Sequence, residues 1–431
     1  MSGHTSIFDI PHITELIASH LDQSDLLSCI LVNKAFYSQF ASLLWEELIF
    51  KPSPDTKNIE VTNDEQEKTW INNCQWTRHL TVNSKGLDYR MLTLLKASCT
   101  RLKTLNCYNM AMQGWDDADF EQLFALVERN TQLQSWSLLS CDTLSSDRLR
   151  QFSKVLSNVP SLTELKLDLL FHPRRGWLQF LLRSIPSSLR KLHINWGYLF
   201  EGSGDEEYPL QTWPERYPSM EDVDMAIFLT REEEQHFFNF LERCPALQHL
   251  AVPSIMTSTP GLEHFIRLIG SRSMFPNLID LDLHRISELN ERESRALLEA
   301  MEGRIKSFVA ETIFSIPELV DKWSGTIESL QLHHLRASGE DIRNLIVTCK
   351  KLKRMDCRWP LMNEDTPPDT CFDSDLVKEY WITQDLEALR RMFIEDAQKS
   401  KERALNSMQD TWVVSKVEDV LSDVTEELVA N

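Results

Sequence analysis

A short motif, Leu-x-x-Leu-x-Leu with conservative replacements, returns through most of the chain and constrains its fold more than any other feature. The copies run over Leu102–Cys107, Leu133–Leu138, Leu162–Leu167, Leu189–Ile194, Met220–Met225, Leu247–Val252, Leu278–Leu283, Ile305–Ala310, Ile327–Leu332 and Leu352–Cys357. A weaker copy, Thr77–Val82, precedes them. Successive starts from Leu102 are 31, 29, 27, 31, 27, 31, 27, 22 and 25 residues apart. A chain with this internal period is expected to grow in one direction, each unit packing on its neighbours.

The spacing inside the motif predicts a strand. Its last two apolar residues are two apart, so they share one face of an extended chain, while the first residue turns inward just before them. The distance between copies leaves room for a return segment, which makes consecutive strands parallel. Periods of about 20 to 29 residues are typical of leucine-rich repeats. We therefore expect an α/β fold, a leucine-rich-repeat solenoid with parallel strands on the concave face and helices outside.

The return segments carry one apolar stripe each at helical spacing, which predicts helices whose stripe is core rather than a ligand site. Clear examples are Phe120, Leu123, Phe124 and Val127; Leu149, Phe152, Val155 and Leu156; Phe237, Phe238 and Leu241; and Leu262, Phe265, Ile266 and Ile269. The Asn or Cys that usually follows the strand of such a repeat is matched here only by Cys141. Apolar residues such as Phe228 and Ile255 stand at the equivalent positions, so we expect an irregular solenoid whose turns satisfy their backbone groups differently.

The N-terminal segment from Ile7 to Leu48 has a different pattern and is expected to form three short helices. The first carries an apolar stripe of Ile13, Leu16, Ile17 and Leu21; the second carries Leu26, Leu27, Ile30 and Leu31; and the third carries Phe36, Phe40, Leu43 and Leu44. About forty residues cannot bury this many large apolar side chains against one another. Part of this surface is expected to dock on something else.

These helices, the run from Asp25 to Lys34 and the closing Leu44-Trp45 resemble an F-box. The family's usual tryptophan is replaced by Phe36, the acidic residue that commonly follows the opening proline is His12, and the Leu-Pro opening reads Ile10-Pro11. An F-box followed by leucine-rich repeats is similar to the substrate receptors of cullin-RING (SCF-type) ubiquitin ligases, and the degenerate repeats look most like the fungal group.

The resemblance implies the partners of the chain. The F-box would bind the Skp adaptor, and through it the cullin and RING subunits, while the repeats would hold a target protein that the sequence does not identify. The positions that match the family's adaptor contacts are Pro11, Ile13, Ile17, Leu26, Leu27 and Val32. Such a receptor performs no bond chemistry, so the chain is not expected to be an enzyme.

Composition and motifs divide the chain into four parts. Residues 7–48 are assigned to the F-box, and 49–70, which are rich in charge, to a linker. Residues 71–362 hold about 10 to 11 repeats, as the motif copies indicate. Residues 363–431 contain 17 acidic and 7 basic side chains and are expected to form an acidic cap and helical tail. There Trp381, Leu386 and Leu389 suggest one degenerate repeat before a helix from Met392 to Met408.

Charge and cysteine usage exclude several classes of function. A net charge of −20 argues against nucleic acid and anionic membrane surfaces as partners, because both require a positive footprint. No apolar run approaches the ~18 residues that span a bilayer, and no secretory signal is visible, so we expect a cytoplasmic or nuclear protein. The nine cysteines lack disulfide or zinc-finger spacing and are expected to be reduced. Cys99, Cys244 and Cys349 each precede a motif by three residues and are expected to be buried.

One polar constellation stands out on the predicted strands. It comprises Asp222, Asp224, His249, Asp280, Asp282 and His284, which occupy solvent-facing positions of three adjacent repeats. Stacked strands about 4.8 Å apart would gather these side chains. We consider them candidates for target binding, with a basic segment of the target as the expected ligand, aided by an acidic, aromatic-rich loop at residues 200–213.

Two other functions remain open from the sequence. A scaffold could bind a partner through its repeats without a ubiquitin-ligase role, its N-terminal helices serving as a cap. An enzyme could use the Asp and His constellation as a hydrolytic metal site, although no phosphate loop, zinc-protease or serine-hydrolase motif accompanies it. An exposed strand face is also simply where polar residues belong, and no metal or cofactor is expected.

Overall fold

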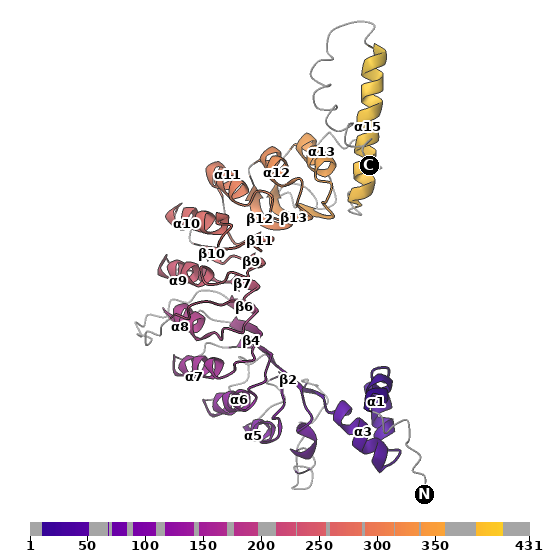
Figure 1. Ribbon diagram of the computed structural model, residues 1–431, viewed down its shortest axis with the longest axis vertical. Coiled ribbons are helices and arrows are strands. Elements are labelled where there is room, and N and C mark those ends of the chain that lie inside the picture. Colours follow the sequence, from indigo (N-terminus) through magenta and orange to yellow (C-terminus); the bar gives the residue numbers. More distant parts are fainter. Residues whose placement is uncertain are drawn as a thin grey trace. The chain divides into compact units, whose positions relative to one another are not determined.

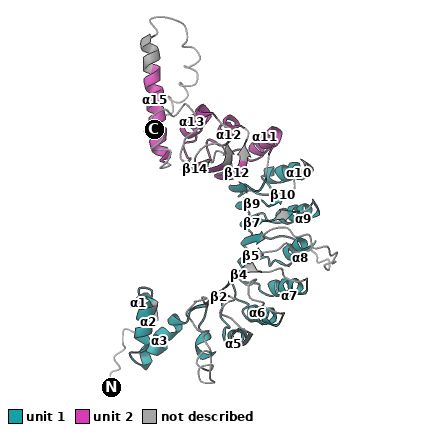
Figure 2. Ribbon diagram, turned by 180° about the vertical axis from the view of Figure 1, so that it is seen from behind, with its two compact units in different colours: residues 1–287 teal, residues 288–431 magenta. Residues whose placement is uncertain are grey.

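The computed structural model describes residues 11–50, 68, 71–83, 89–108, 117–141, 146–169, 176–196, 213–229, 231–255, 259–286, 289–313, 315–335, 338–357 and 385–407. The chain divides into two compact units, residues 1–287 and 288–431 (Figure 2). The division falls inside the stretch assigned to repeats. Each unit has the α/β architecture of a leucine-rich-repeat solenoid, as the motif predicts.

Unit 1 begins with the three expected helices, α1 (Pro11–Ala18), α2 (Gln23–Ile30) and α3 (Lys34–Leu44). Short polar side chains start the second and third helices, because they accept hydrogen bonds from otherwise unpaired backbone N–H groups. Asp22 accepts from the Asp25 N–H at 2.8 Å, and Asn33 accepts from the Phe36 N–H at 2.9 Å. Phe40 is the most buried side chain of this segment and packs against Phe36.

The sheet begins earlier than the sequence predicts. Strand β1 (Glu47–Phe50) follows α3 directly and pairs in parallel with β2 (His79–Asn83), so the sheet starts within the segments assigned to the F-box and the linker rather than at residue 71. The Thr77 hydroxyl donates to the Trp45 carbonyl at 3.0 Å, which ties the two elements together. β1 lies in a stretch, Trp45-x-x-Leu48-x-Phe50, that has the spacing of the repeat motif with aromatic residues in place of its first and last leucines. The sequence prediction did not count it as a repeat because Trp45 was assigned to the end of the F-box.

The strands of unit 1 follow one another in the order β1-β2-β3-β4-β5-β6-β7-β9-β11, and each neighbouring pair is parallel. The remaining bounds are β3 (Thr104–Tyr108), β4 (Ser135–Cys141), β5 (Glu164–Leu169), β6 (Lys191–Trp196), β7 (Asp222–Ala226), β9 (His249–Ala251) and β11 (Asp280–Leu283). Each motif copy from Thr77 to Leu283 therefore forms a strand. Buried and partly exposed side chains alternate along these strands: in β3 and β7 every second side chain is buried.

Six helices lie on one side of this sheet (Figure 1). They are α5 (Tyr89–Ser98), α6 (Asp117–Arg129), α7 (Ser146–Ser157), α8 (Trp177–Ser184), α9 (Arg231–Leu241) and α10 (Thr259–Gly270). The predicted stripes are buried and form the core; for example, Trp136 of β4 has its ring centroid 4.9 Å from Phe152 and 6.4 Å from Phe124. Each such large side chain contributes about 1.5 to 3 kcal/mol through burial.

Backbone groups at the turns are satisfied in two ways that the motif does not show. The buried amide of Asn130 donates to the carbonyls of Cys99 and Leu126 at 2.9 and 2.7 Å and accepts from the Leu102 N–H at 2.8 Å, so it joins consecutive repeats. At the apolar positions Phe228 and Ile255, a second parallel ladder forms between β8 (Phe228–Leu229) and β10 (Ser254–Ile255). At these turns, backbone groups that the usual Asn or Cys would satisfy thus pair with a neighbouring turn as a short strand.

Unit 2 repeats the same plan with β12 (Ser307–Ile313), β13 (Ser329–Leu335) and β14 (Arg354–Cys357), which are parallel and adjacent in that order. Its helices are α11 (Glu291–Ala300), α12 (Ile316–Trp323), α13 (Gly339–Thr348) and α15 (Leu386–Ser407). Reciprocal capping boxes start α11 at Asn290 and α13 at Ser338. The last three motif copies therefore also form strands.

Helix α15 covers the end of the last described repeat. Arg390 is buried and donates to the carbonyls of Ile346, Cys349 and Leu352, while Arg343 of α13 donates to Asp396 at 3.0 Å. Leu386 and Leu389 belong to this helix rather than to a further strand. Trp381, the acidic stretch 363–384 and the tail after residue 407 lie outside the described residues. Among the described cysteines, all are free thiols and Cys99, Cys244 and Cys349 are buried, as expected.

Candidate functional site

The polar face of the unit 1 sheet consists of the strand residues that alternate with the core. Two rows cross it in the register of the strands. One row contains Glu164, Lys191, Asp222, His249 and Asp280, and the next contains Lys166, His193, Asp224, Ala251 and Asp282. Acidic and basic or titratable side chains therefore stand side by side on neighbouring strands. We call the part of this face formed by β5, β6, β7, β9, β11 and residues 284–285 the charged strip.

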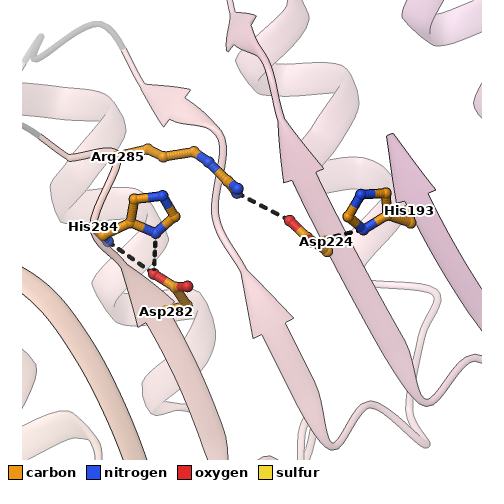
Figure 3. A network of polar contacts seen from close by, with 5 residues as sticks. All are labelled: His193, Asp224, Asp282, His284 and Arg285. Atoms are coloured by element: carbon orange, nitrogen blue, oxygen red, sulfur yellow. Dashed lines mark hydrogen bonds and ion pairs between the residues drawn. The ribbon is translucent and has the colours of Figure 1, made fainter. Parts of the chain in front are cut away.

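Three histidines of the charged strip each contact an aspartate through Nδ1. His193 Nδ1 lies 2.8 Å from Asp224 Oδ2, and His284 Nδ1 lies 2.6 Å from Asp282 Oδ1 (Figure 3). The third pair joins adjacent strands: His249 Nδ1 lies 3.3 Å from Asp280 Oδ2. All three imidazoles remain partly open to water. The net charge of the strip thus depends on the protonation of these imidazoles as well as on the carboxylates.

Arg285 connects two strands that are not neighbours. It follows β11, and its guanidinium donates to Asp224 Oδ1 on β7 at 3.0 Å (Figure 3). Between them, β9 carries only the short side chain of Ala251 in that row. Burial raises the pKa of Asp224, but the bonds from His193 and Arg285 outweigh it and leave the pKa below its ordinary value. Asp224 is therefore ionised and held from two sides.

Asp222 differs from its neighbours because its carboxylate makes no hydrogen bond or ion pair within the described residues. Partial burial raises the pKa of Asp222, and the nearby His249 and Lys191 lower it without cancelling the effect of burial. It lies opposite Lys191 on one side and His249 on the other. Among the carboxylates of the strip, Asp222 is therefore the one that a cationic group of a partner would stabilise most.

The structure brings the six predicted target-binding residues onto one face, but not into one cluster. Asp280 pairs with His249, and Asp282 pairs with His284, whereas Asp224 pairs with two residues that the prediction left out, His193 and Arg285. The position of His193 in the motif row was readable from the sequence. Arg285 stands after the strand, and nothing in its position indicates that its side chain reaches over β9.

The chemistry available to this strip is charge recognition. Within the described part of the chain, no group of three or more His, Cys, Asp or Glu side chains is arranged to hold a metal ion. Each Nδ1 of the three imidazoles lies against a carboxylate. Paired imidazoles and carboxylates can bind and release charged groups of a partner.

A second candidate surface lies on helices α1 and α2 and on the turn that follows α2. Four aliphatic side chains of this segment are unusually exposed: Leu16 by 63%, Leu27 by 51%, Leu31 by 78% and Val32 by 64%. Exposed apolar side chains gathered in one small segment are typical of a protein interface. We call these four residues the apolar surface of the N-terminal helices.

The adaptor contacts expected from the F-box resemblance fall partly on this surface. Leu27 and Val32 are exposed, while Ile13, Ile17 and Leu26 are half-buried, and the side chain of Pro11 lies outside the described residues. Leu16 and Leu31 were expected only as members of helical stripes. Helical spacing identifies a stripe, but it does not say whether another element of the same chain covers it.

The aromatic loop at 200–213 is described only at Trp213. Its ring lies beneath two guanidinium groups, with Arg183 at 5.0 Å and Arg243 at 5.3 Å from the ring centroid. These residues belong to α8 and to the turn after α9, so Trp213 packs beside the helices. The proposed help of the loop in target binding otherwise concerns residues that the structure does not describe.

Comparisons with known proteins add little to this geometry. No protein-family model matches the sequence, and no curated protein matches it. Among solved structures, the chain is similar to one described as "Crystal structure of Rad7 and Elc1 complex in yeast", with a TM-score of 0.41 and 12% identity over 80% of this chain and 81% of that chain. A similarity of this size says nothing about what the present chain binds. Among the described helices, none is long and apolar enough to cross a membrane.

Proposed function

We propose that the chain is a substrate-recognition adaptor of an SCF-type ubiquitin ligase. In this proposal the apolar surface of the N-terminal helices binds the Skp adaptor, which links the chain to cullin and RING subunits. The polar face of the repeats binds a target protein. The observation that carries the proposal is the exposure of Leu16, Leu27, Leu31 and Val32 within a three-helix segment joined directly to a repeat sheet.

Physical chemistry favours a covered state for this segment. Leaving aliphatic side chains in water forgoes about 1.5 to 3 kcal/mol per leucine that burial would supply. Phe40 and Ala41 are buried within the segment, whereas these four side chains are exposed. A partner with an apolar groove, as the F-box resemblance implies for the Skp adaptor, would recover that free energy.

The proposed role needs no reactive group in this chain. A receptor that holds a target beside a ubiquitin-charged enzyme acts by proximity, which raises the effective concentration of the reacting groups. The charged strip is suited to holding a protein, because its partly exposed side chains come from several strands of one sheet and are fixed by mutual contacts.

Co-purification of the Skp adaptor with the full chain tests the proposal. The double variant Leu27→Asp with Val32→Asp should abolish the complex, because both side chains are exposed and the change places charge in the proposed interface. Ile49→Asp is the matched control, since Ile49 is an exposed aliphatic residue on β1 outside the helices. Circular dichroism should show that both variants remain folded.

Two outcomes would count against the ligase role. Undiminished co-purification of the double variant would remove the helices from the interface. Absence of the Skp adaptor from purifications of the unaltered chain, with target proteins still bound, would favour a repeat scaffold that acts without ubiquitylation.

A further inference from the structure

The charge of the charged strip depends on three protons. Its carboxylates are Glu164, Asp168, Asp222, Asp224, Asp280 and Asp282, and its permanent cations are Lys166, Lys191 and Arg285. The strip therefore carries three net negative charges while His193, His249 and His284 are neutral, and none once all three are protonated. At the strand entries beside it, Arg190 and Glu221 cancel each other in an ion pair.

The negative charge left at neutral pH is concentrated around β9. Lys166 pairs with Glu164 at 2.8 Å, and Arg285 pairs with Asp224 at 3.0 Å, so these carboxylates are neutralised by permanent cations. Asp168 accepts a hydrogen bond from the amide of Asn195. Asp280 pairs with the His249 imidazole, Asp282 accepts from the His284 backbone N–H and contacts the His284 imidazole, and Asp222 has no partner within the described residues, so none of the three is paired with a permanent cation.

The imidazoles occupy the positions that a bound cation would need. In the register of the sheet, His249 stands between Asp222 and Asp280, and His284 contacts Asp282. A protonated imidazole neutralises its aspartate from within the chain. A neutral imidazole leaves that aspartate available to a lysine or arginine of a partner, so protons and the basic partner compete for the same carboxylates.

We propose that the charged strip binds a basic segment of the target protein and releases it when His193, His249 and His284 become protonated, so that association is controlled by pH. This inference rests on the proposed function, since it names the class of target and its regulation. Histidine is the side chain whose ordinary pKa places its charge change between about pH 5 and 8.

The test uses the full chain and a fluorescein-labelled peptide of alternating lysine and serine, with an alternating glutamate and serine peptide as control. Binding is measured by fluorescence anisotropy at pH 7.4 and pH 5.5 in the same salt. Adding three positive charges near a bound basic segment should weaken its affinity by about tenfold, as expected for several charge pairs at high effective dielectric. The acidic peptide should gain no affinity at pH 7.4.

Variants show whether the strip is responsible. The triple variant H193N, H249N and H284N keeps neutral hydrogen-bonding side chains but cannot be protonated, so its peptide affinity should stay within about twofold between the two pH values. His79→Asn is the matched control, because His79 lies on the same sheet but its Nδ1 contacts the Thr104 hydroxyl at 3.1 Å, not a carboxylate. This control should retain the full pH dependence.

Asp222→Asn combined with Asp280→Asn should weaken peptide binding at pH 7.4, whereas Asp147→Asn on α7 should not. The inference is overturned if the triple variant keeps the pH dependence of the unaltered chain, if the basic peptide binds more tightly at pH 5.5, or if the double Asp variant binds as well as the unaltered chain. Co-purification of the Skp adaptor is measured separately, so failure of the proposed function remains distinguishable from failure of this inference.

Discussion

At the scale of single residues, identical side chains differ according to what surrounds them. Asp224 and Asp222 are two apart on β7 and share one face, yet the pKa of Asp224 is lowered by His193 and Arg285 and that of Asp222 is raised by burial. The sequence shows two equivalent aspartates. The difference arises because His193 and, reaching over Ala251, Arg285 both contact Asp224, whereas no described residue bonds to the Asp222 carboxylate.

This difference predicts the effect of Asp222→Asn on stability. A carboxyl group whose pKa is raised in the folded state binds its proton more tightly there than in the unfolded chain, so its ionisation costs stability as the pH rises above the ordinary value of 3.8. Asp222→Asn should therefore raise the urea midpoint at pH 7. The gain should shrink toward pH 3, where both states bind the proton.

Urea unfolding at the two pH values checks this prediction, with Asp147→Asn on the helical side as control. A lower midpoint for Asp222→Asn at pH 7 would mean that Asp222 makes a favourable ion pair in solution, contrary to the account of the strip.

At the scale of elements, periodicity predicts much of the fold and little of its connections. All eleven motif copies are strands, because residues two apart must share a face and the apolar ones must be buried. Strand β1 was not predicted because aromatic residues replace the first and last leucines of its motif, Trp45-x-x-Leu48-x-Phe50, and Trp45 was assigned to the F-box. The ladder of β8 and β10 was missed because nothing in two apolar turn residues specifies that their backbones will pair.

Side-chain contacts between elements are harder to predict than the elements themselves. Helical spacing correctly predicted apolar stripes on α6, α7, α9 and α10, but the same reasoning gave no sign that Leu16 and Leu31 remain exposed. The exposure of a side chain depends on which other segment of the chain packs against its helix, and the sequence of one helix does not contain that information. The same limit applies to Arg390, because it is far from α13 in the sequence and its hydrogen bonds to the carbonyls at the end of that helix could not be predicted.

Arg390 provides a test of how α15 closes the last described repeat. Its guanidinium donates to three carbonyls at the end of α13 and in the following turn. Arg390→Ala would remove a donor from each of these carbonyls, of which that of Cys349 would still accept from the Leu352 N–H, and an unsatisfied buried group costs about 1 to 3 kcal/mol. We expect unit 2 to lose about 2 to 4 kcal/mol of unfolding free energy in all, since the losses add only in part.

Arg391→Ala is the matched control, because Arg391 is the exposed neighbour on the same helix. Hydrogen exchange of α13 and β14 reports the effect locally. Equal exchange in the two variants would show that α15 does not depend on Arg390 for its attachment.

At the scale of the whole molecule, both candidate surfaces belong to unit 1. The apolar surface of the N-terminal helices and the charged strip are built on segments joined through β1 and β2, while the described part of unit 2 supplies three further strands and four helices. The two surfaces differ in chemistry, one aliphatic and one charged. This difference is what a receptor requires if it binds an adaptor and a target independently.

Hydrogen–deuterium exchange of the full chain, alone and mixed with the Skp adaptor, tests the central claim most directly because it locates the interface. The account predicts slower exchange in α1, α2 and the turn containing Leu31 and Val32, with unchanged exchange in β5 to β11. Unchanged exchange throughout the N-terminal helices, or protection confined to the strands of the charged strip, would contradict the claim that these helices dock the adaptor.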